Sequence, residues 1–332
     1  MKKVLMVYNP TSGKNSARKK PDEIIRIFRE NGFSVTEKTT TCVGDGTQIV
    51  KNNLVGHDLV ACCGGDGTFN EAVNGIMALD SKKPLMYIPM GTTNDLANTI
   101  GVTKDIEKQI DLYKKGYVNS YDIGSFNNNH FNYVASFGVA TDASYMTSQK
   151  FKNMFGYAAY RVNGFILRMP HYIKTLRAYH MKIEYDGGVL EDDFYFGAVS
   201  NTNVVANLFK YDKLCIKLND GEFECLFIRG VKGVLDVFHL LKKVIDQDYD
   251  GKQIITFRTK KLKITGAEET AWTLDGEFGG NHKNIDIDVN AGAINIVSPP
   301  SKYFLTDKEP YKEDEKVFGE EDLQKRNRKT KG

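Results

Sequence analysis

The chain has 332 residues, of which 41% are hydrophobic and 26% charged, and its formal net charge is +3. This composition is ordinary for a soluble globular protein, and the length is sufficient for two domains with their own cores. A net charge this small gives no reason to expect nucleic acid as a partner. No apolar run reaches the roughly 20 residues that span a bilayer, so any membrane contact is expected to be peripheral.

The five cysteines follow no disulfide or zinc spacing, which favours free thiols in a reducing compartment. The apolar run at the amino terminus is short and ends at Asn9-Pro10, so it is typical of a first strand and not of a signal peptide. These features predict a cytoplasmic protein.

Strand and helix patterns alternate in the first part of the chain. They predict strands over 4–8, 34–40, 59–62, 85–89 and 118–123, and helices over 21–31, 47–53 and 106–115, with two more after the glycine loop at 64–67 and after Thr93. Such alternation predicts an open parallel α/β sheet that binds ligands at the carboxyl ends of its strands.

From about Phe126 the pattern changes to short alternating segments separated by turn signals, which predicts a mostly antiparallel β-sandwich. Helical patterns interrupt it over 157–169 and 234–245. We therefore expect an α/β domain over 1–125, a β domain over 126–290, a segment over 291–305 that returns to the first domain, and a charged, partly disordered tail over 306–332.

The segment Gly64-Gly65-Asp66-Gly67-Thr68 lies between a predicted strand and a predicted helix. Its glycines allow backbone amides to approach a bound phosphate, and Thr68 is expected to cap the helix. Neither a Walker A loop nor a Rossmann fingerprint is present. Because a carboxylate repels polyphosphate unless a cation intervenes, Asp66 implies a metal-assisted nucleotide site, and the alternative is an ordinary tight turn.

Two further loops follow predicted strands. In Asn9–Lys14, backbone amides can form an anion site to which Lys14 adds a mobile charge; the alternative is a turn with a solvated lysine. In Met90–Asp95, hydroxyl and amide groups precede another helix, where they either hold phosphate or serve as caps.

The second half holds two acidic turns. Asp275 and Glu277 either share an extended strand, in which case their side chains point the same way, or belong to an Asp-Gly hairpin that leaves Glu277 on the surface. Asn219-Asp220-Gly221 is expected to be a turn in any case.

Five blocks of sequence, in this order, resemble the diacylglycerol kinase catalytic family of lipid kinases, and the short chain resembles its Gram-positive bacterial branch. The blocks are Tyr8–Lys14, Gly64–Thr68, Pro89–Asp95, Tyr121–Gly124 and Leu274–Glu277. The resemblance implies a nucleotide-binding α/β domain of the type shared with NAD kinase and a β domain for the lipid. It also implies ATP and Mg²⁺ as cofactors, and phosphatidic acid made from diacylglycerol at the inner face of the cell membrane.

The resemblance also implies residue roles. Catalysis is expected from Glu277 as proton acceptor, with Asp275, Asp66 and Lys14. The residues expected to bind the nucleotide are Asn9, Pro10, Thr11, Ser12, Gly13, Thr40, Gly65, Asp66, Gly67, Thr68, Phe69, Asn70, Glu71, Thr92, Asn94 and Asp95. A structural Mg²⁺ is expected on Asp220 and the main-chain carbonyls of Lys217 and Glu222, while Asp122 is similar to a residue that supports the catalytic magnesium–water network.

Several alternatives remain open. The acceptor could be a sphingoid base, phosphatidylglycerol or a polyprenol, since this chain departs from its relatives at Asn163 and Asn207. NAD kinase and a non-catalytic nucleotide-binding regulator are rival functions, and a homodimer is left open. The basic and aromatic stretch 150–177 favours either an anionic bilayer or a helix packed on the β domain.

Overall fold

The computed structural model describes residues 1–13, 20–91, 94–138, 177–202, 204–205, 209–210, 216–230 and 251–305, together with 236, 239–240, 242–243, 246 and 249. For Asp95 and for 204–205 and 209–210 it describes the backbone alone. The predicted helix over 157–169, the charged tail, Lys14, Thr92, Asn163 and Asn207 lie outside the described residues, as do most of the basic and aromatic stretch 150–177 and of the predicted helix over 234–245.

The chain divides into two compact units, which are Met1–Asn119 with the residues from Asn295 onward, and Ser120–Ile294. From the sequence we placed the breaks at 125 and 291. The observed breaks differ by a few residues because a single strand runs through each of them, namely β5 (Val118–Phe126) and β15 (Glu277–Val297). Continuous strands carry no turn signal from which a boundary could be predicted.

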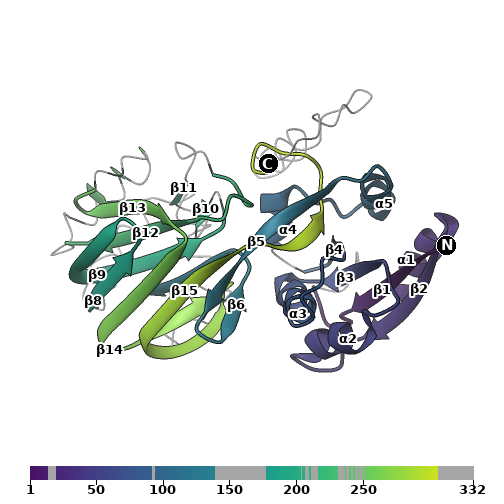
Figure 1. Cartoon of the computed structure of the whole chain (residues 1–332), viewed down its shortest axis with the longest axis horizontal. Helices are drawn as coiled ribbons and strands as arrows, with labels where there is room; N and C mark the ends of the chain where they lie inside the picture. Colours follow the sequence, from purple (N-terminus) through teal and green to yellow (C-terminus); the bar gives the residue numbers. More distant parts are fainter. Residues whose placement is uncertain are drawn as a thin grey trace, which may run out of the picture. The chain divides into compact units, whose positions relative to one another are not determined.

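The first unit contains a parallel sheet with the strand order β4-β3-β1-β2 (Figure 1). Its strands are β1 (Lys2–Tyr8), β2 (Phe33–Thr39), β3 (Leu59–Gly64) and β4 (Leu85–Pro89), and Ile296 of β15 pairs in parallel with Leu85 at the β4 edge. The α/β character predicted from the alternation is confirmed, and every strand of this sheet ends within two residues of its predicted bound.

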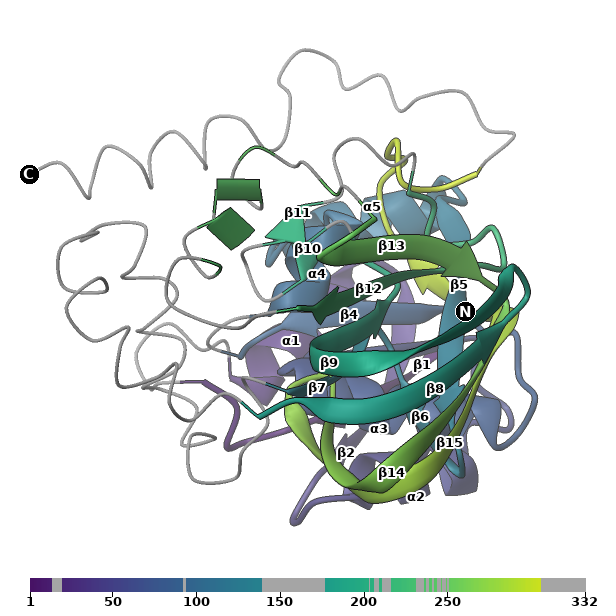
Figure 2. The ribbon, with the colours of Figure 1, turned by 90° about the vertical axis from the view of Figure 1, so that its left-hand side faces the viewer.

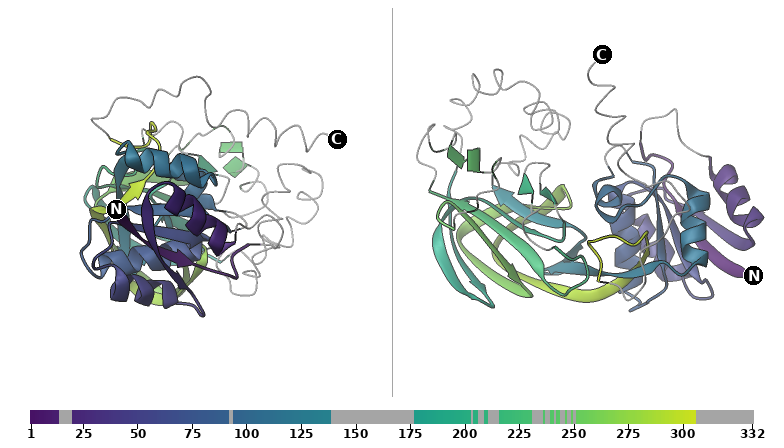
Figure 3. Two further views of the ribbon diagram at one scale, coloured as in Figure 1. Left: turned by 90° about the vertical axis from the view of Figure 1, so that its right-hand side faces the viewer. Right: turned by 90° about the horizontal axis from the view of Figure 1, so that it is seen from above.

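Helices cover both faces of this sheet (Figure 3). On one face α1 (Pro21–Glu30) and α5 (Ile106–Lys114) bury apolar residues against alternate residues of the strands, such as Val4 and Met6. On the other face α2 (Asp45–Asn53) packs on α3 (Asp66–Met77). These helices approach so closely that a Cβ atom on Gly75 would lie 2.6 Å from Val50. The short α4 (Asp95–Ile100) follows the loop after β4.

The second unit is built from antiparallel strands. The first is the part of β5 from Ser120 onward, and the last is the part of β15 up to Ile294. Between them, in chain order, lie β6 (Asn129–Phe131), β7 (Val134–Gly138), β8 (Tyr179–Tyr185), β9 (Gly188–Ser200), the short pair β10 (Val204–Val205) and β11 (Phe209–Lys210), β12 (Phe223–Arg229), β13 (Ile254–Thr259) and β14 (Lys261–Leu274).

We predicted a sandwich of two sheets, but apart from the β10–β11 pair the described strands form one continuous sheet. It runs β13-β12-β9, then β8 and β7, then β14-β15-β5-β6 (Figure 2). Long strands make this possible, because β9 and β14 each pair with β8 along one half and with β7 along the other. The sheet curls around a core that includes Trp272, and Phe131 of β6 contacts Phe223 of β12 with ring centroids 5.5 Å apart.

Candidate functional site

The glycine loop after β3 joins directly to α3. Gly65 is the N-cap residue and the helix begins at Asp66, so Thr68 lies inside the first turn and does not cap the helix as we predicted. Thr68 is 5% exposed, and its hydroxyl accepts a hydrogen bond from the Asn9 side-chain amide at 2.8 Å. A Cβ atom on Gly64 would lie 2.5 Å from the Thr68 side chain, so Thr68 fits here only because residue 64 is glycine.

The loop after β1 is held against the glycine loop. The Asn9 N–H donates to the Cys63 carbonyl at 2.9 Å, and the Gly65 N–H donates to the Ser12 hydroxyl at 3.2 Å. The Asn9 side-chain oxygen accepts two bonds from Thr11, from the N–H at 2.9 Å and from the hydroxyl at 2.8 Å. Four of the predicted nucleotide-binding residues, Asn9, Thr11, Ser12 and Gly65, therefore fix the path of this loop.

The loop after β4 meets the other two. Gly13, with a φ of +75°, leaves room for the Met90 carbonyl, which would lie 2.2 Å from a Cβ atom. A Cβ atom on Gly91 would lie 2.8 Å from the Cα atom of Gly65. Main chain thus approaches main chain at each of these points, as a phosphate-binding backbone requires. We call the described residues of the three loops, 9–13, 64–68, 90–91 and 94, the phosphate corner.

Asn94 and Asp66 complete the described part of this corner. Asn94 is 5% exposed, has a φ of +51°, and donates from its side-chain amide to the Gly91 carbonyl at 2.8 Å. The Tyr87 hydroxyl lies 3.3 Å from the Asp66 carboxylate and 3.4 Å from the side-chain oxygen of Asn94. The Asp66 carboxylate is on the first residue of α3, where the helix dipole favours negative charge.

Glu71, one of the predicted nucleotide-binding residues, is engaged elsewhere. Its two carboxylate oxygens accept the backbone N–H groups of Gly44 and Gly46, each at 2.8 Å. These groups belong to the first turn of α2, whose N-cap Gly44 has a left-handed backbone and no side-chain cap. Glu71 therefore supplies from α3 the acceptor that α2 lacks, a role that sequence analysis missed.

The remaining predicted nucleotide residues lie around the same loops. Thr40 is buried, and its N–H donates to the Tyr8 carbonyl at 2.9 Å. Phe69 is buried against Tyr87, Pro10 and Gly67 are exposed, and Asn70 is half-buried.

In the second unit, Asp275 and Gly276 form a two-residue hairpin turn between β14 and β15. Their φ angles are +52° and +84°, and Leu274 pairs with Glu277 across the turn. Positive φ at both turn residues is the signature of the type I′ hairpin. The hairpin alternative is therefore confirmed and the shared extended strand is wrong.

The Asp275 carboxylate holds the segment before β7. One oxygen accepts the Asn132 N–H at 2.7 Å and the Asn132 side-chain amide at 2.8 Å; the other accepts the N–H groups of Tyr133 at 2.9 Å and Val134 at 3.1 Å. The Tyr133 hydroxyl donates to the Asp275 carbonyl at 3.1 Å. The Glu277 side chain, by contrast, is exposed, and its carboxylate makes no hydrogen bond or ion pair within the described part of the chain. The neighbouring Phe278 is 54% exposed.

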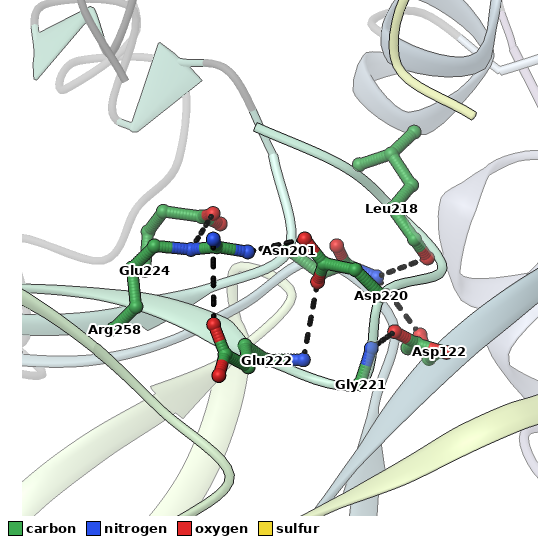
Figure 4. Close-up of polar contacts among 8 residues, drawn as sticks. All are labelled: Asp122, Asn201, Leu218, Asp220, Gly221, Glu222, Glu224 and Arg258. Carbon is green, nitrogen blue, oxygen red and sulfur yellow. Dashed lines mark hydrogen bonds and ion pairs between the residues drawn. The ribbon is translucent and has the colours of Figure 1, made fainter. Parts of the chain in front are cut away.

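The predicted Asp220 turn carries a cluster of charges that sequence analysis did not connect (Figure 4). Arg258 of β13 pairs through one terminal nitrogen with Asp220, through the other with Glu222 at 3.3 Å, and through Nε with Glu224 at 3.4 Å. The Glu222 N–H donates to the second oxygen of Asp220 at 3.2 Å. Glu224 is fully buried, and burial raises its pKa to about 8 although Arg258 opposes the shift.

Asp122 of β5 is tied to the same turn. Its two carboxylate oxygens accept the N–H groups of Gly221 at 2.7 Å and Gly292 at 2.6 Å. Burial raises the pKa of Asp122, and these two bonds oppose the rise. The buried Asn201 side chain bridges the carbonyls of Asp122 and Leu218, at 3.0 and 3.2 Å.

The chemistry of the Asp220 turn fits a hard divalent cation. Among the described residues, no group of three or more His, Cys, Asp or Glu side chains is arranged to hold a metal. A cation at this turn would therefore need main-chain carbonyls beside a carboxylate, and the donors expected from the sequence are Asp220, Lys217 and Glu222. The carboxylates of Asp220 and Glu222 also outnumber the single guanidinium of Arg258.

Comparison with known proteins places these features in a family. A family model described as the diacylglycerol kinase catalytic domain matches residues 3–126. A diacylglycerol kinase of Bacillus subtilis (strain 168) is 32% identical over 284 residues, which cover 84% of this chain and 91% of that protein. One from Staphylococcus aureus (strain MRSA252) is 29% identical over 305 residues, covering 89% and 94%.

Solved structures show the same fold. Two crystal structures from Bacillus anthracis str. Sterne, one of them named a diacylglycerol kinase, each match 90% of this chain, with TM-scores of 0.71 and 0.65 at 23% and 22% identity. No helix among the described residues is long and apolar enough to cross a membrane.

Proposed function

Because this chain belongs to the diacylglycerol kinase family, we propose that it transfers the γ-phosphoryl group of ATP, with Mg²⁺, to the free hydroxyl of diacylglycerol and so makes phosphatidic acid. Lipid kinase activity follows from the family. The phosphate corner supports ATP as the donor, and the close approach of the Gly65 and Gly91 backbones is the observation that carries this assignment.

In this proposal the phosphate corner binds the phosphates mainly through its main chain. We assign the N–H groups of residues 12, 13, 65 and 67 to the phosphate oxygens, and Lys14 adds a positive charge for the γ-phosphate. The Ser12 and Gly65 N–H groups donate to the Asn9 carbonyl at 3.4 Å and to the Ser12 hydroxyl at 3.2 Å, and a bound phosphate would replace these two contacts. Asn94 and Asp95 lie at the start of α4, where donors and the helix dipole also favour an anion. We assign Thr40, which directly follows the edge strand β2, to the nucleoside.

Mg²⁺, when bound, would neutralise charge that develops on the transferred phosphoryl group. Asp66 is the described carboxylate of the phosphate corner, and it is our candidate for holding that ion or its water. From its resemblance to the family residue, we assign Asp122 to the support of a magnesium–water network. Its carboxylate is fixed by two backbone N–H groups, which suits a supporting role better than direct proton transfer.

We assign the proton acceptor to Glu277. The acceptor alcohol attacks the γ-phosphorus, its proton passes to the Glu277 carboxylate, and the bond to the bridging oxygen of ADP breaks. Glu277 suits this role because its carboxylate is exposed and has no partner within the described residues. Asp275 does not, since four N–H groups already occupy its oxygens, so we assign it the positioning of the hairpin.

The second unit is the part that we assign to the lipid, and the enzyme would act on acceptors presented at the inner face of the cell membrane. A structural Mg²⁺ at the Asp220 turn is a further part of the proposal. It rests on the oxygen donors and on the excess of carboxylates described above.

The test is a phosphorylation assay with radiolabelled ATP and a panel of acceptors. We expect label in phosphatidic acid from diacylglycerol, and much less from a sphingoid base, phosphatidylglycerol, a polyprenol or NAD. Asp66→Asn serves as the matched inactive variant, since it keeps the size of the side chain and its contact with Tyr87 but removes the charge. Preferred labelling of another lipid would mean that this lipid, and not diacylglycerol, is the acceptor. Labelling of NAD would overturn the proposal.

A further inference from the structure

Arg258 is the cation of the Asp220 turn. Its guanidinium contacts the carboxylates of Asp220, Glu222 and Glu224, and it reaches them from β13, the strand next to β12 (Figure 4). Its side chain is 34% exposed and that of Asp220 is 15% exposed. The pair with Asp220 is thus partly shielded from water, where an opposite charge is worth more than on an open surface.

Both oxygens of Asp220 are already engaged. One contacts Arg258 and the other accepts the Glu222 N–H. A divalent cation that ligates Asp220 would face the guanidinium across the same carboxylate, and two cations this close repel each other. Arg258 has other partners to retain, because its other nitrogens contact Glu222 and Glu224. The Arg258 guanidinium can therefore give up its contact with Asp220 and still face the Glu222 carboxylate.

The turn is also connected to Asp122. Gly221, the residue after Asp220, donates its N–H to the Asp122 carboxylate at 2.7 Å. Its backbone has a φ of +78°, so the direction of this N–H depends on the turn conformation. Whatever fixes Asp220 therefore also fixes one of the two hydrogen bonds that orient Asp122.

From these contacts we propose that Arg258 and a divalent cation are alternative counter-ions of Asp220. In the absence of the cation, Arg258 keeps the 219–222 turn, and with it the bond from Gly221 to Asp122, in place. Arg258 is thus a positioning residue that makes the turn largely independent of metal and lowers its affinity for one. The inference rests on the structural Mg²⁺ of the proposed function.

The test measures Mg²⁺ binding to the whole chain by thermal unfolding, from EDTA to saturating Mg²⁺ and without nucleotide. Arg258→Gln should melt at a lower temperature than the parent in EDTA and recover most of the loss in Mg²⁺. Its half-saturating Mg²⁺ concentration should be about fivefold lower than that of the parent, which corresponds to the free energy of one partly exposed ion pair. Arg258→Lys keeps the charge but lacks the planar guanidinium, so its half-saturating Mg²⁺ concentration should lie between those of the parent and Arg258→Gln. Amide exchange at Gly221 should be faster in Arg258→Gln than in the parent only in EDTA.

Two controls identify the site. Arg177→Gln removes another arginine ion pair of the same unit, with Glu268, and should leave the Mg²⁺ response unchanged. Asp220→Asn should abolish the response both alone and combined with Arg258→Gln. Equal or weaker Mg²⁺ binding by Arg258→Gln, or a response that survives Asp220→Asn, would overturn the inference. Neither readout needs lipid or ATP, so the phosphorylation assay decides the proposed function separately.

Discussion

Asp66 and Asp275 each precede a glycine, yet the structure uses the two Asp-Gly pairs differently. Asp66 opens α3, and the glycines around it let three loops approach one another through their main chains. Asp275 is the first residue of a hairpin turn. Its carboxylate accepts four N–H groups from Asn132, Tyr133 and Val134, which lie 141 to 143 residues earlier in the chain. One Asp-Gly pair lies where the main chains of three loops meet, while the other ties a hairpin to a distant segment.

The groups already bonded to the oxygens of a carboxylate distinguish acids that hold the main chain from acids that are available to a ligand. Glu71 lies three residues after the Gly64–Thr68 block and Asp275 lies inside the Leu274–Glu277 block, and both have each carboxylate oxygen bonded to backbone N–H groups. Glu277 has no partner within the described residues. We therefore expect acids of the first kind to position main chain, and we look for the catalytic acid among those of the second kind.

Replacement of Glu277 should give the largest effect. If Glu277 takes the proton of the acceptor, Glu277→Gln should lower kcat by about 10²–10⁴-fold and leave the KM values for ATP and lipid nearly unchanged. Its melting temperature should equal that of the parent, because the side chain is exposed. Steady-state kinetics with both substrates varied, beside a thermal melt, measures all of this.

Asp275→Asn is the matched variant for that experiment. Its amide would turn a donor toward N–H groups that now meet a carboxylate oxygen, so we expect it to cost about 1–3 kcal/mol of unfolding free energy, with a smaller loss of kcat. The reverse pattern, a stable Asp275→Asn with the greater loss of kcat, would make Asp275 the base and remove the distinction between the two acids.

The first unit could be predicted from the sequence because its signals are local. Each strand alternates with a helix, and the sterically necessary Gly64 and Gly91 fall at or near strand ends, where a sheet of this kind binds ligands. The exception inside this unit is the cap of α2. It is provided by Glu71, which lies 27 residues beyond the Gly44 N–H that it accepts, and no spacing rule connects the two.

The second unit was predicted less well, since its contacts join distant segments. The hairpin at Asp275 carries a local signal, but its partner Asn132 does not. Arg258 likewise lies 38 residues from Asp220, and only the pairing of β12 with β13 brings them together. The curling of the sheet depends on where β9 and β14 change partners, which alternation of residues along a strand cannot specify.

The pH dependence of stability should differ between the parent and Glu224→Gln. The folded-state pKa of Glu224 is about 8, against an ordinary value of 4.5. Between these values the folded protein keeps a proton that the unfolded chain releases, so stability falls as the pH rises. Glu224 should contribute up to about 1.4 kcal/mol of loss per pH unit in that window.

Denaturant unfolding in EDTA at about pH 5 and about pH 8 measures this contribution. The difference in unfolding free energy between the two pH values should shrink in Glu224→Gln, which stays neutral while keeping its size. Asp122, whose pKa burial also raises, remains in both proteins and therefore does not affect the comparison. Equal slopes in both proteins would mean that Glu224 is ionised in the fold.

Replacement of Glu71 should give the smallest effect and directly tests the assignment of motif acids. Glu71→Gln leaves one oxygen for the two N–H groups of Gly44 and Gly46, so we expect a loss of about 1–2 kcal/mol and a fall of a few degrees in melting temperature. The KM for ATP should stay near that of the parent. Glu107→Gln, on the exposed first turn of α5, is the control, since it should change neither quantity. A raised KM for ATP at an unchanged melting temperature would instead assign Glu71 to the nucleotide, and the hydrogen bonds of a motif acid would no longer predict its role.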